Sequence, residues 1–264
     1  MKFARLGHFF KNHYFLLALS AGLISYTLPY SNEKKGLLCV FISLAVFLAY
    51  NTHKLVKWLR EKGSYASIQS LRFLPTRILF FVATLSFLGI GISLHFRWSE
   101  YFLLSILFFM CLSYSVFQPK FSIRSIPYLK SFFIALSWTS LCCALPMSYA
   151  NKAFYNGSFF FILFYVLAVS SDFRDLRIDP IELKTLPQVL PRKALLILIL
   201  FGLITFGIVN LYFYGPLFFI AALLSSLVFS YYLFQFFMLK KELYTDRTLA
   251  AFGLSAFILQ VYFR

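Results

Sequence analysis

Residues 193 to 210 read KALLILILFGLITFGIVN, and this stretch decides the fold class. Between Lys193 and Asn210 it contains no charged residue. The hydrocarbon core of a bilayer is about 30 Å thick, so a helix that crosses it needs roughly 17 to 25 mostly apolar residues. The stretch therefore predicts a transmembrane helix.

The same pattern recurs along the whole chain. Of its 264 residues, 61% are hydrophobic and 13% are charged, whereas about a quarter of a soluble domain is charged. This composition excludes an ordinary soluble domain and a disordered chain. We predict an all-α integral membrane protein that forms a single polytopic domain over residues 1–264, with nine transmembrane helices. The predicted spans are residues 14 to 30, 36 to 50, 78 to 96, 100 to 117, 131 to 149, 154 to 171, 193 to 210, 215 to 238 and 246 to 262.

The distribution of Lys and Arg predicts the orientation of these spans. The first run follows a short basic segment and lacks a small-residue cleavage pattern, which favours a retained span over a signal peptide. With the N-terminus inside, 20 of the 25 Lys and Arg residues fall on the inner side. Positive charge is retained on the cytoplasmic side of membranes, so we expect the N-terminus inside and the C-terminus outside.

The net charge of +16 does not indicate nucleic-acid binding. The basic residues flank apolar runs, where they would face the anionic cytoplasmic leaflet. The cysteines lie inside apolar runs without the spacing of metal ligands, so we expect them to act as small buried hydrophobic residues. They are Cys39, Cys111, Cys142 and Cys143.

The acidic residues are unusually clustered. Of nine in the chain, four lie between Asp172 and Glu182. On a helix that continues beyond residue 171, Asp172, Asp175 and Asp179 would share one face. Two interpretations remain open: the carboxylates pair with Arg174 and Arg177 on a solvated helix end, or they bind a hard cation such as Mg²⁺ together with phosphate oxygens.

A basic helix end occupies the equivalent position after the second span. There the sequence reads YNTHKLVK over residues 50 to 57. The second and sixth spans would run in the same direction, which suggests a weak internal repeat with two polar helix ends facing a cavity. Lys and His donate to phosphate oxygens, although such side chains also snorkel at helix ends without further function. The candidate residues at this end are Asn51, His53, Lys54 and Lys57.

These features together resemble the UbiA-type intramembrane prenyltransferase superfamily. Its members have nine transmembrane helices around a central cavity, with an Asp-rich motif NDxxDxxxD after helix two and a second one, such as DxxDxxxD, after helix six. Residues 172 to 179 read DFRDLRID and are followed by KTLP at 184 to 187, which is similar to the second motif. Other similar positions are Tyr114, Lys120, Arg124, Pro127, Lys130, Trp138 and Asp246.

The first motif departs from the family pattern. Asn51 matches, but Thr52, Leu55 and Leu59 stand where the family has aspartates. In the family, both motifs help to bind Mg²⁺ and an isoprenyl diphosphate, whose prenyl group passes to an acceptor. All carboxylates of the first half-site are therefore missing.

The resemblance implies prenyl transfer to an aromatic or other small or lipid acceptor. In this interpretation Asp172 and Asp175 are catalytic, and Mg²⁺ is held by Asp172, Asp175 and Asp179. Basic residues replace the missing cation, since positive charge at the leaving diphosphate need not all be metal. The diphosphate-binding residues would be Asn51, His53, Lys54, Lys57, Lys120, Arg124 and Lys184.

Two alternatives are a catalytically inactive protein of the same fold and a transporter. The inactive protein would bind an isoprenoid or another lipid, or support a membrane complex. A transporter is the more distant alternative, because the spans contain almost no ionisable residues near their centres. The acceptor stays open among a quinone precursor, a porphyrin-like ring, a sugar and a lipid. The resemblance and the charge asymmetry indicate a bacterial inner membrane.

Overall fold

The computed structural model describes residues 15–28, 33–62, 74–115, 129–150, 160–174, 185–239 and 251–258. Within these ranges all regular structure is helical, and there are no strands. The all-α prediction is therefore confirmed for the part of the chain that is described.

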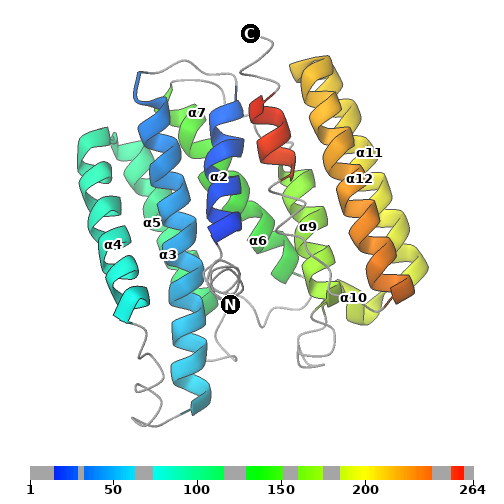
Figure 1. Ribbon diagram of the computed structural model, residues 1–264, viewed down its shortest axis with the longest axis horizontal. Coiled ribbons are helices and arrows are strands. Elements are labelled where there is room, and N and C mark those ends of the chain that lie inside the picture. The colour runs from blue at the N-terminus through cyan, green and yellow to red at the C-terminus, as the bar shows by residue number, and fades with distance from the viewer. Residues whose placement is uncertain are drawn as a thin grey trace, which may run out of the picture.

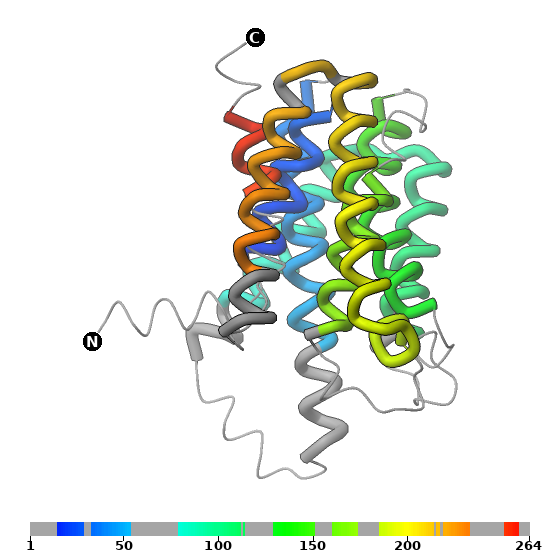
Figure 2. Tube along the Cα trace, turned by 90° about the vertical axis from the view of Figure 1, so that its right-hand side faces the viewer, coloured from blue at the N-terminus to red at the C-terminus, as the bar shows by residue number. Residues whose placement is uncertain are grey.

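The long helices run up and down along one common direction (Figures 1 and 2). Each of the apolar runs predicted from the sequence contains a helix. In chain order the elements are α2 (Phe15–Thr27), α3 (Lys35–Lys62), α4 (Leu74–Leu94), α5 (Trp98–Ser115), α6 (Lys130–Thr139), η4 (Ser140–Ala144), α7 (Leu145–Tyr149), α9 (Phe160–Arg174), α10 (Leu186–Val189), α11 (Arg192–Tyr214), α12 (Pro216–Leu239) and a helix over 251–258.

Three segments are long and apolar enough to cross a membrane, among the residues that the structure describes. They are Lys35–His53, Lys130–Tyr149 and Arg192–Phe213, with 19, 20 and 22 residues. At 1.5 Å per residue, the longest of them spans about 33 Å. Large apolar side chains on the outside of the bundle are consistent with a lipid environment: Ile92 is 73% exposed and Phe201 is 70% exposed.

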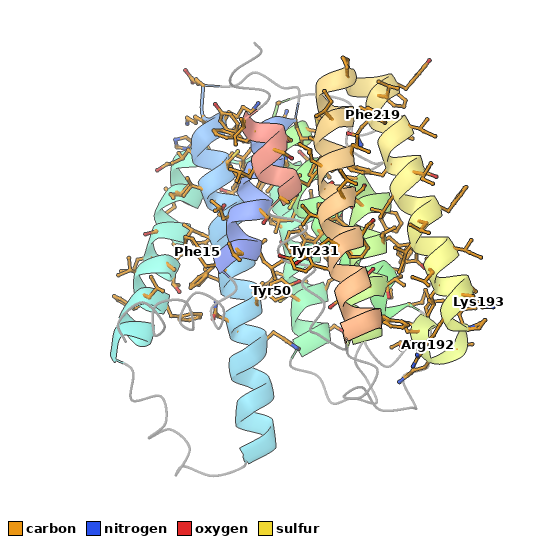
Figure 3. The ribbon with its side chains drawn as sticks, turned by 45° about the vertical axis from the view of Figure 1, so that its right-hand side comes forward. Phe15, Tyr50, Arg192, Lys193, Phe219 and Tyr231 are labelled. Atoms are coloured by element: carbon orange, nitrogen blue, oxygen red, sulfur yellow. The ribbon has the colours of Figure 1, made fainter. Side chains whose placement is uncertain are left out.

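The helix ends fall into two groups. We call the end of the bundle at the bottom of Figure 1 the lower end; there α3 and α9 finish and α6 and α11 begin. At the opposite, upper end, α2 and α4 finish and α3 and α5 begin. Figure 3 shows Arg192 and Lys193 at the lower end of α11 and Phe219 near the top of α12. Trp98 and Tyr212 lie near the upper helix ends and are 90% and 84% exposed, as expected of aromatic residues at a membrane interface.

The fifth predicted span is a helix with a wider turn in its middle. A π-helical turn over Ser140–Ala144 separates α6 from α7, and Pro146 is the second residue of α7. Proline has no backbone N–H to bond the preceding turn, and π-type turns accommodate such interruptions. Cys142 and Cys143 of this turn are fully buried and Cys39 is also buried, which confirms the prediction for these three cysteines, whereas Cys111 is only partly buried.

Close packing brings the first and last helices into the bundle. α2 packs on α3 so closely at Gly22 that a Cβ atom there would lie 2.9 Å from the Cys39 carbonyl oxygen and would collide with Ser43. In the helix over 251–258, the Phe252 ring lies 5.3 Å from Phe206 and the Phe257 ring 5.3 Å from Tyr26. The last helix therefore links α2 with α11.

Some boundaries differ from the sequence prediction. The second span was predicted to end at residue 50, whereas α3 continues as one helix to Lys62 (Figure 1). Charged residues end an apolar run, but they do not interrupt the backbone hydrogen bonds of a helix. The polar segment that follows Tyr50 is therefore held on a regular helix.

Candidate functional site

Buried charge marks the lower end of the bundle. Within the described residues, three charged side chains are buried: Glu100, Lys130 and Asp172. The last two form one ion pair, in which Lys130 Nζ lies 2.7 Å from Asp172 Oδ1. The hydroxyl of Ser131 donates to Asp172 Oδ2 at 2.5 Å. Both carboxylate oxygens of Asp172 are therefore engaged by the start of α6.

The packing of α6 against α9 explains this pairing. The two helices are antiparallel neighbours, and the rings of Trp138 and Phe164 lie 5.4 Å apart in the same interface. Trp138 follows Lys130 by eight residues, and Asp172 follows Phe164 by eight residues. Eight residues are slightly more than two helical turns. Lys130 and Trp138 therefore lie on one face of α6, and Phe164 and Asp172 lie on the face of α9 that packs against it.

α3 joins this interface from the other side. Trp138 Nε1 donates to the hydroxyl of Tyr50 at 3.2 Å, and the two rings meet edge to face. Since α3 descends where α6 ascends, the helical positions of Lys54 and Lys57 lie about one and two turns below Tyr50, toward the level of Lys130. The backbone therefore carries two basic positions of α3 toward the lower end.

The predicted residues of the basic helix end have different surroundings. Asn51 is half-buried and donates from Nδ2 to the Phe47 carbonyl oxygen of its own helix at 2.8 Å. His53 is also half-buried. Lys54 and Lys57 belong to α3, but their side chains lie outside the described set.

Several predicted site residues lie outside the described residues. They are Lys120, Arg124, Asp175, Asp179 and Lys184. The chain is described again from Thr185, whose N–H donates to Gln188 Oε1 at 2.8 Å, and the short helix α10 then packs between α9 and α11. The segment after the acidic motif thus returns to the lower end of the bundle (Figure 1).

The described residues give a partial test of the magnesium prediction. Among them, no group of three or more His, Cys, Asp or Glu side chains is placed to hold a metal ion. Asp172 supplies one carboxylate, and its oxygens already accept from an ammonium group and a hydroxyl. A divalent cation bound to this carboxylate would lie near the ammonium of Lys130, and the two positive charges would repel each other.

Sequence reasoning missed the partners of Asp172. Lys130 was noted only as a basic residue of an inner loop, and Ser131 carried no signal. A lysine on the first residue of an apolar run, with a serine next to it, could have indicated a buried acidic partner, since an unpaired charge there is costly. Which carboxylate it meets depends on helix packing.

A second buried charge, Glu100, lies at the upper end. Its Oε1 is 2.6 Å from Arg97 Nη2, and it also accepts from the hydroxyl of Ser148 at 2.8 Å. The hydrogen bond that Arg97 donates to the Glu100 carboxylate raises the pKa of the Arg97 guanidinium above its ordinary value. The spacing of Arg97 and Glu100 at i and i+3 was a readable signal for this pair.

No protein-family model, curated protein or solved structure matches the chain. The resemblance to the UbiA-type superfamily therefore depends on the residues of the motifs themselves.

Proposed function

We propose that this protein is a polytopic membrane protein of UbiA-like architecture that transfers an isoprenyl group from an isoprenyl diphosphate to an aromatic or other small or lipid acceptor. In this proposal nine helices cross a bacterial inner membrane, with the N-terminus inside and the C-terminus outside. The lower end of the bundle then faces the cytoplasm.

One observation supports the proposal: α9 brings Asp172 to Lys130 at the start of α6, and α3 contacts the same helix through Tyr50 and Trp138 before it continues toward the lower end (Figure 1). The helical positions of α3 that follow Tyr50 and the buried Asp172 of α9 therefore both lie toward the lower end. A diphosphate placed there would have cationic groups from α3 and α6 near it. This convergence is what a two-half diphosphate site requires.

The chemistry follows from charge. The bond between the allylic carbon and the diphosphate oxygen breaks, the oxygen keeps the electron pair, and the carbon becomes cationic. An electron pair of the acceptor then forms the new bond to that carbon, and the acceptor loses a proton. Lys130, Lys54 and Lys57 would stabilise the departing diphosphate, because fixed positive charge lowers the energy of developing negative charge.

Mg²⁺ would be held by Asp172, Asp175 and Asp179 and would add positive charge at the leaving diphosphate. In this arrangement the carboxylate of Asp172, which is paired with Lys130, would have to be available to the metal ion. When a diphosphate binds, the ammonium of Lys130 gains a second anionic partner, which would release Asp172 to its other ligands. The proposal thus assigns Lys130 to substrate binding.

The proposal is tested by the release of pyrophosphate. Purified protein in detergent should release pyrophosphate from an allylic diphosphate only in the presence of Mg²⁺, and Asp175→Ala should abolish this release. The matched control is Glu61→Ala, which removes a carboxylate from α3 outside the acidic motif and should leave turnover unchanged. Equal turnover of Asp175→Ala and the unmodified protein would refute the enzymatic function.

A second candidate is a non-catalytic isoprenoid-binding or lipid-binding protein of the same architecture. The observation that favours it is the pairing of Asp172 with Lys130 and Ser131 in the interface of α6 and α9, which gives this aspartate a structural role. In that case no diphosphate of any chain length is turned over, yet an isoprenoid copurifies and raises the thermal stability. A lipid-free protein that no isoprenoid stabilises would exclude this candidate.

A further inference from the structure

A polar pocket opens at the upper end of the bundle, far along the helices from the ion pair of Asp172. Its volume is about 310 Å³. Glu33 and Lys34 line it from the turn that precedes α3, His95 and Arg97 from the turn between α4 and α5, and Tyr149 from the end of α7. Three separate parts of the chain therefore form its walls.

Polar cross-links hold these walls together. Lys34 Nζ donates to the Ser93 carbonyl oxygen at 2.8 Å, and the Tyr149 hydroxyl donates to the Leu94 carbonyl oxygen at 2.8 Å. Arg97 binds the buried Glu100 and also donates to the Ser148 carbonyl oxygen. The pocket is thus built by interactions between α3, α4, α5 and α7 and is formed before any ligand arrives.

Two side chains that line the pocket are exposed, those of Glu33 and His95. Within the described part of the chain, the Glu33 carboxylate and the His95 side chain take part in no hydrogen bond or ion pair. His95 also has a φ of 51°, in the left-handed region that favours glycine. This left-handed residue ends α4 directly after Leu94 and turns the chain toward α5.

The charges of the pocket favour a zwitterion over a simple anion. Two carboxylates, Glu33 and Glu100, balance the two cations Lys34 and Arg97. A net anionic ligand would find no excess of positive charge. A ligand that carries both a phosphate and an amine would find an opposite charge for each group.

The surface beside the pocket is apolar. On α4 and α5, the exposed fractions of Ile92, Trp98 and Phe102 are 73%, 90% and 69%. A polar pocket at the end of a lipid-facing helical surface has the arrangement of a headgroup above its acyl chains. We propose that this pocket binds the phosphoethanolamine headgroup of a phospholipid, with the phosphate toward Lys34 and His95 and the ammonium toward Glu33.

Ethanolamine suits the pocket better than choline. A primary ammonium donates hydrogen bonds to a carboxylate, which a quaternary ammonium lacks the protons to do. Quaternary ammonium groups are recognised instead by cages of several aromatic rings, and among the described residues that line this pocket Tyr149 is the one with a phenyl-type ring. This proposal depends on the membrane insertion in the proposed function, but not on prenyl transfer at the lower end.

The test is lipid retention by the full-length protein in detergent. The protein is mixed with phosphatidylethanolamine, phosphatidylcholine or phosphatidylglycerol of the same acyl chains, and bound lipid is counted by native mass spectrometry. We expect phosphatidylethanolamine to be retained about fivefold more than the other two, the ratio that a partly exposed ion pair of about 1 kcal/mol supplies. Equal retention of the three lipids would overturn the proposal.

Variants assign the effect to the pocket. Glu33→Gln should lower the retention of phosphatidylethanolamine to that of phosphatidylcholine, and Lys34→Gln should lower the retention of both. Lys193→Gln, at the exposed lower end of α11, serves as the matched control and should change neither (Figure 3). The thermal stability of Glu33→Gln without lipid shows whether the variant is folded. If the folded variant still prefers phosphatidylethanolamine as strongly as the unmodified protein does, the lipid binds elsewhere and the proposal is wrong.

A last experiment distinguishes a lipid from a soluble ligand. Free phosphoethanolamine contains the same charged groups without acyl chains. We expect it to raise the thermal unfolding temperature far less than the lipid does. An equal increase would show that the pocket serves a soluble phosphorylated amine and would overturn the lipid assignment.

Discussion

The ammonium of Lys130 lies 2.7 Å from Oδ1 of Asp172, and both side chains are buried. This contact joins the first residue of α6 to the last turn of α9. The aspartate that begins the acidic motif is therefore part of a helix interface. Its charge is compensated in the absence of any ligand.

Removing one member of this pair should destabilise the protein strongly. We expect Lys130→Met to lower the free energy of unfolding by about 3 to 5 kcal/mol, because it leaves the Asp172 carboxylate buried without a countercharge. The double variant Lys130→Met, Asp172→Asn should recover more than half of that loss. Denaturant unfolding in mixed micelles measures the free energy of unfolding of each variant. If the change in the double variant equals the sum of the changes in the two single variants, the two charges act independently.

The contact between α3 and α6 predicts a smaller, coupled effect. Tyr50→Phe and Trp138→Phe each remove the hydrogen bond between these residues, at a cost of about 0.5 to 1.5 kcal/mol. Trp138→Phe also loses ring area, so it should be the more costly of the two. A double-mutant cycle should give a favourable coupling energy, whereas a coupling of zero would indicate that the hydrogen bond makes no contribution.

At the upper end, Glu100 should be more important than its polar neighbours. Glu100→Gln replaces a buried carboxylate that accepts from Arg97 and Ser148, and we expect it to cost about 1.5 to 3 kcal/mol. Ser148→Ala removes one neutral donor and should cost about 1 kcal/mol. Thermal unfolding of the two variants in the same detergent measures the loss of stability in each. A greater loss in Ser148→Ala than in Glu100→Gln would contradict this prediction.

The crossing of α2 and α3 makes opposite predictions for two glycines. Gly22→Ala places a Cβ atom against Ser43 and the Cys39 carbonyl oxygen, so it should destabilise by about 1 to 3 kcal/mol. Gly89 of α4 has no atom within 4 Å of its virtual Cβ, and Gly89→Ala should stabilise by up to about 1 kcal/mol through helix propensity. If both variants shift the unfolding temperature in the same direction, close packing at Gly22 is not the cause.

Some features could be read from the sequence because their cause is local. The run from Lys193 to Asn210 lies within α11, since a long apolar segment in lipid has to satisfy its backbone hydrogen bonds internally. Asp172 was identified as a polar residue at a helix end, and it does lie in the last turn of α9. The pattern did not reveal that α3 continues to Lys62, because a count of apolar residues stops where charges begin.

The amino-acid sequence alone determined that the chain is helical and apolar, and where its charged segments interrupt it, because backbone hydrogen bonding and hydropathy act within a few turns. Only the tertiary structure decided that Lys130 neutralises Asp172, that Tyr50 meets Trp138, and that Glu33 and His95 face one pocket. Those pairings depend on the rotation and axial position of each helix against its neighbours. These are set by the packing of many side chains at once, and no single stretch of sequence encodes them.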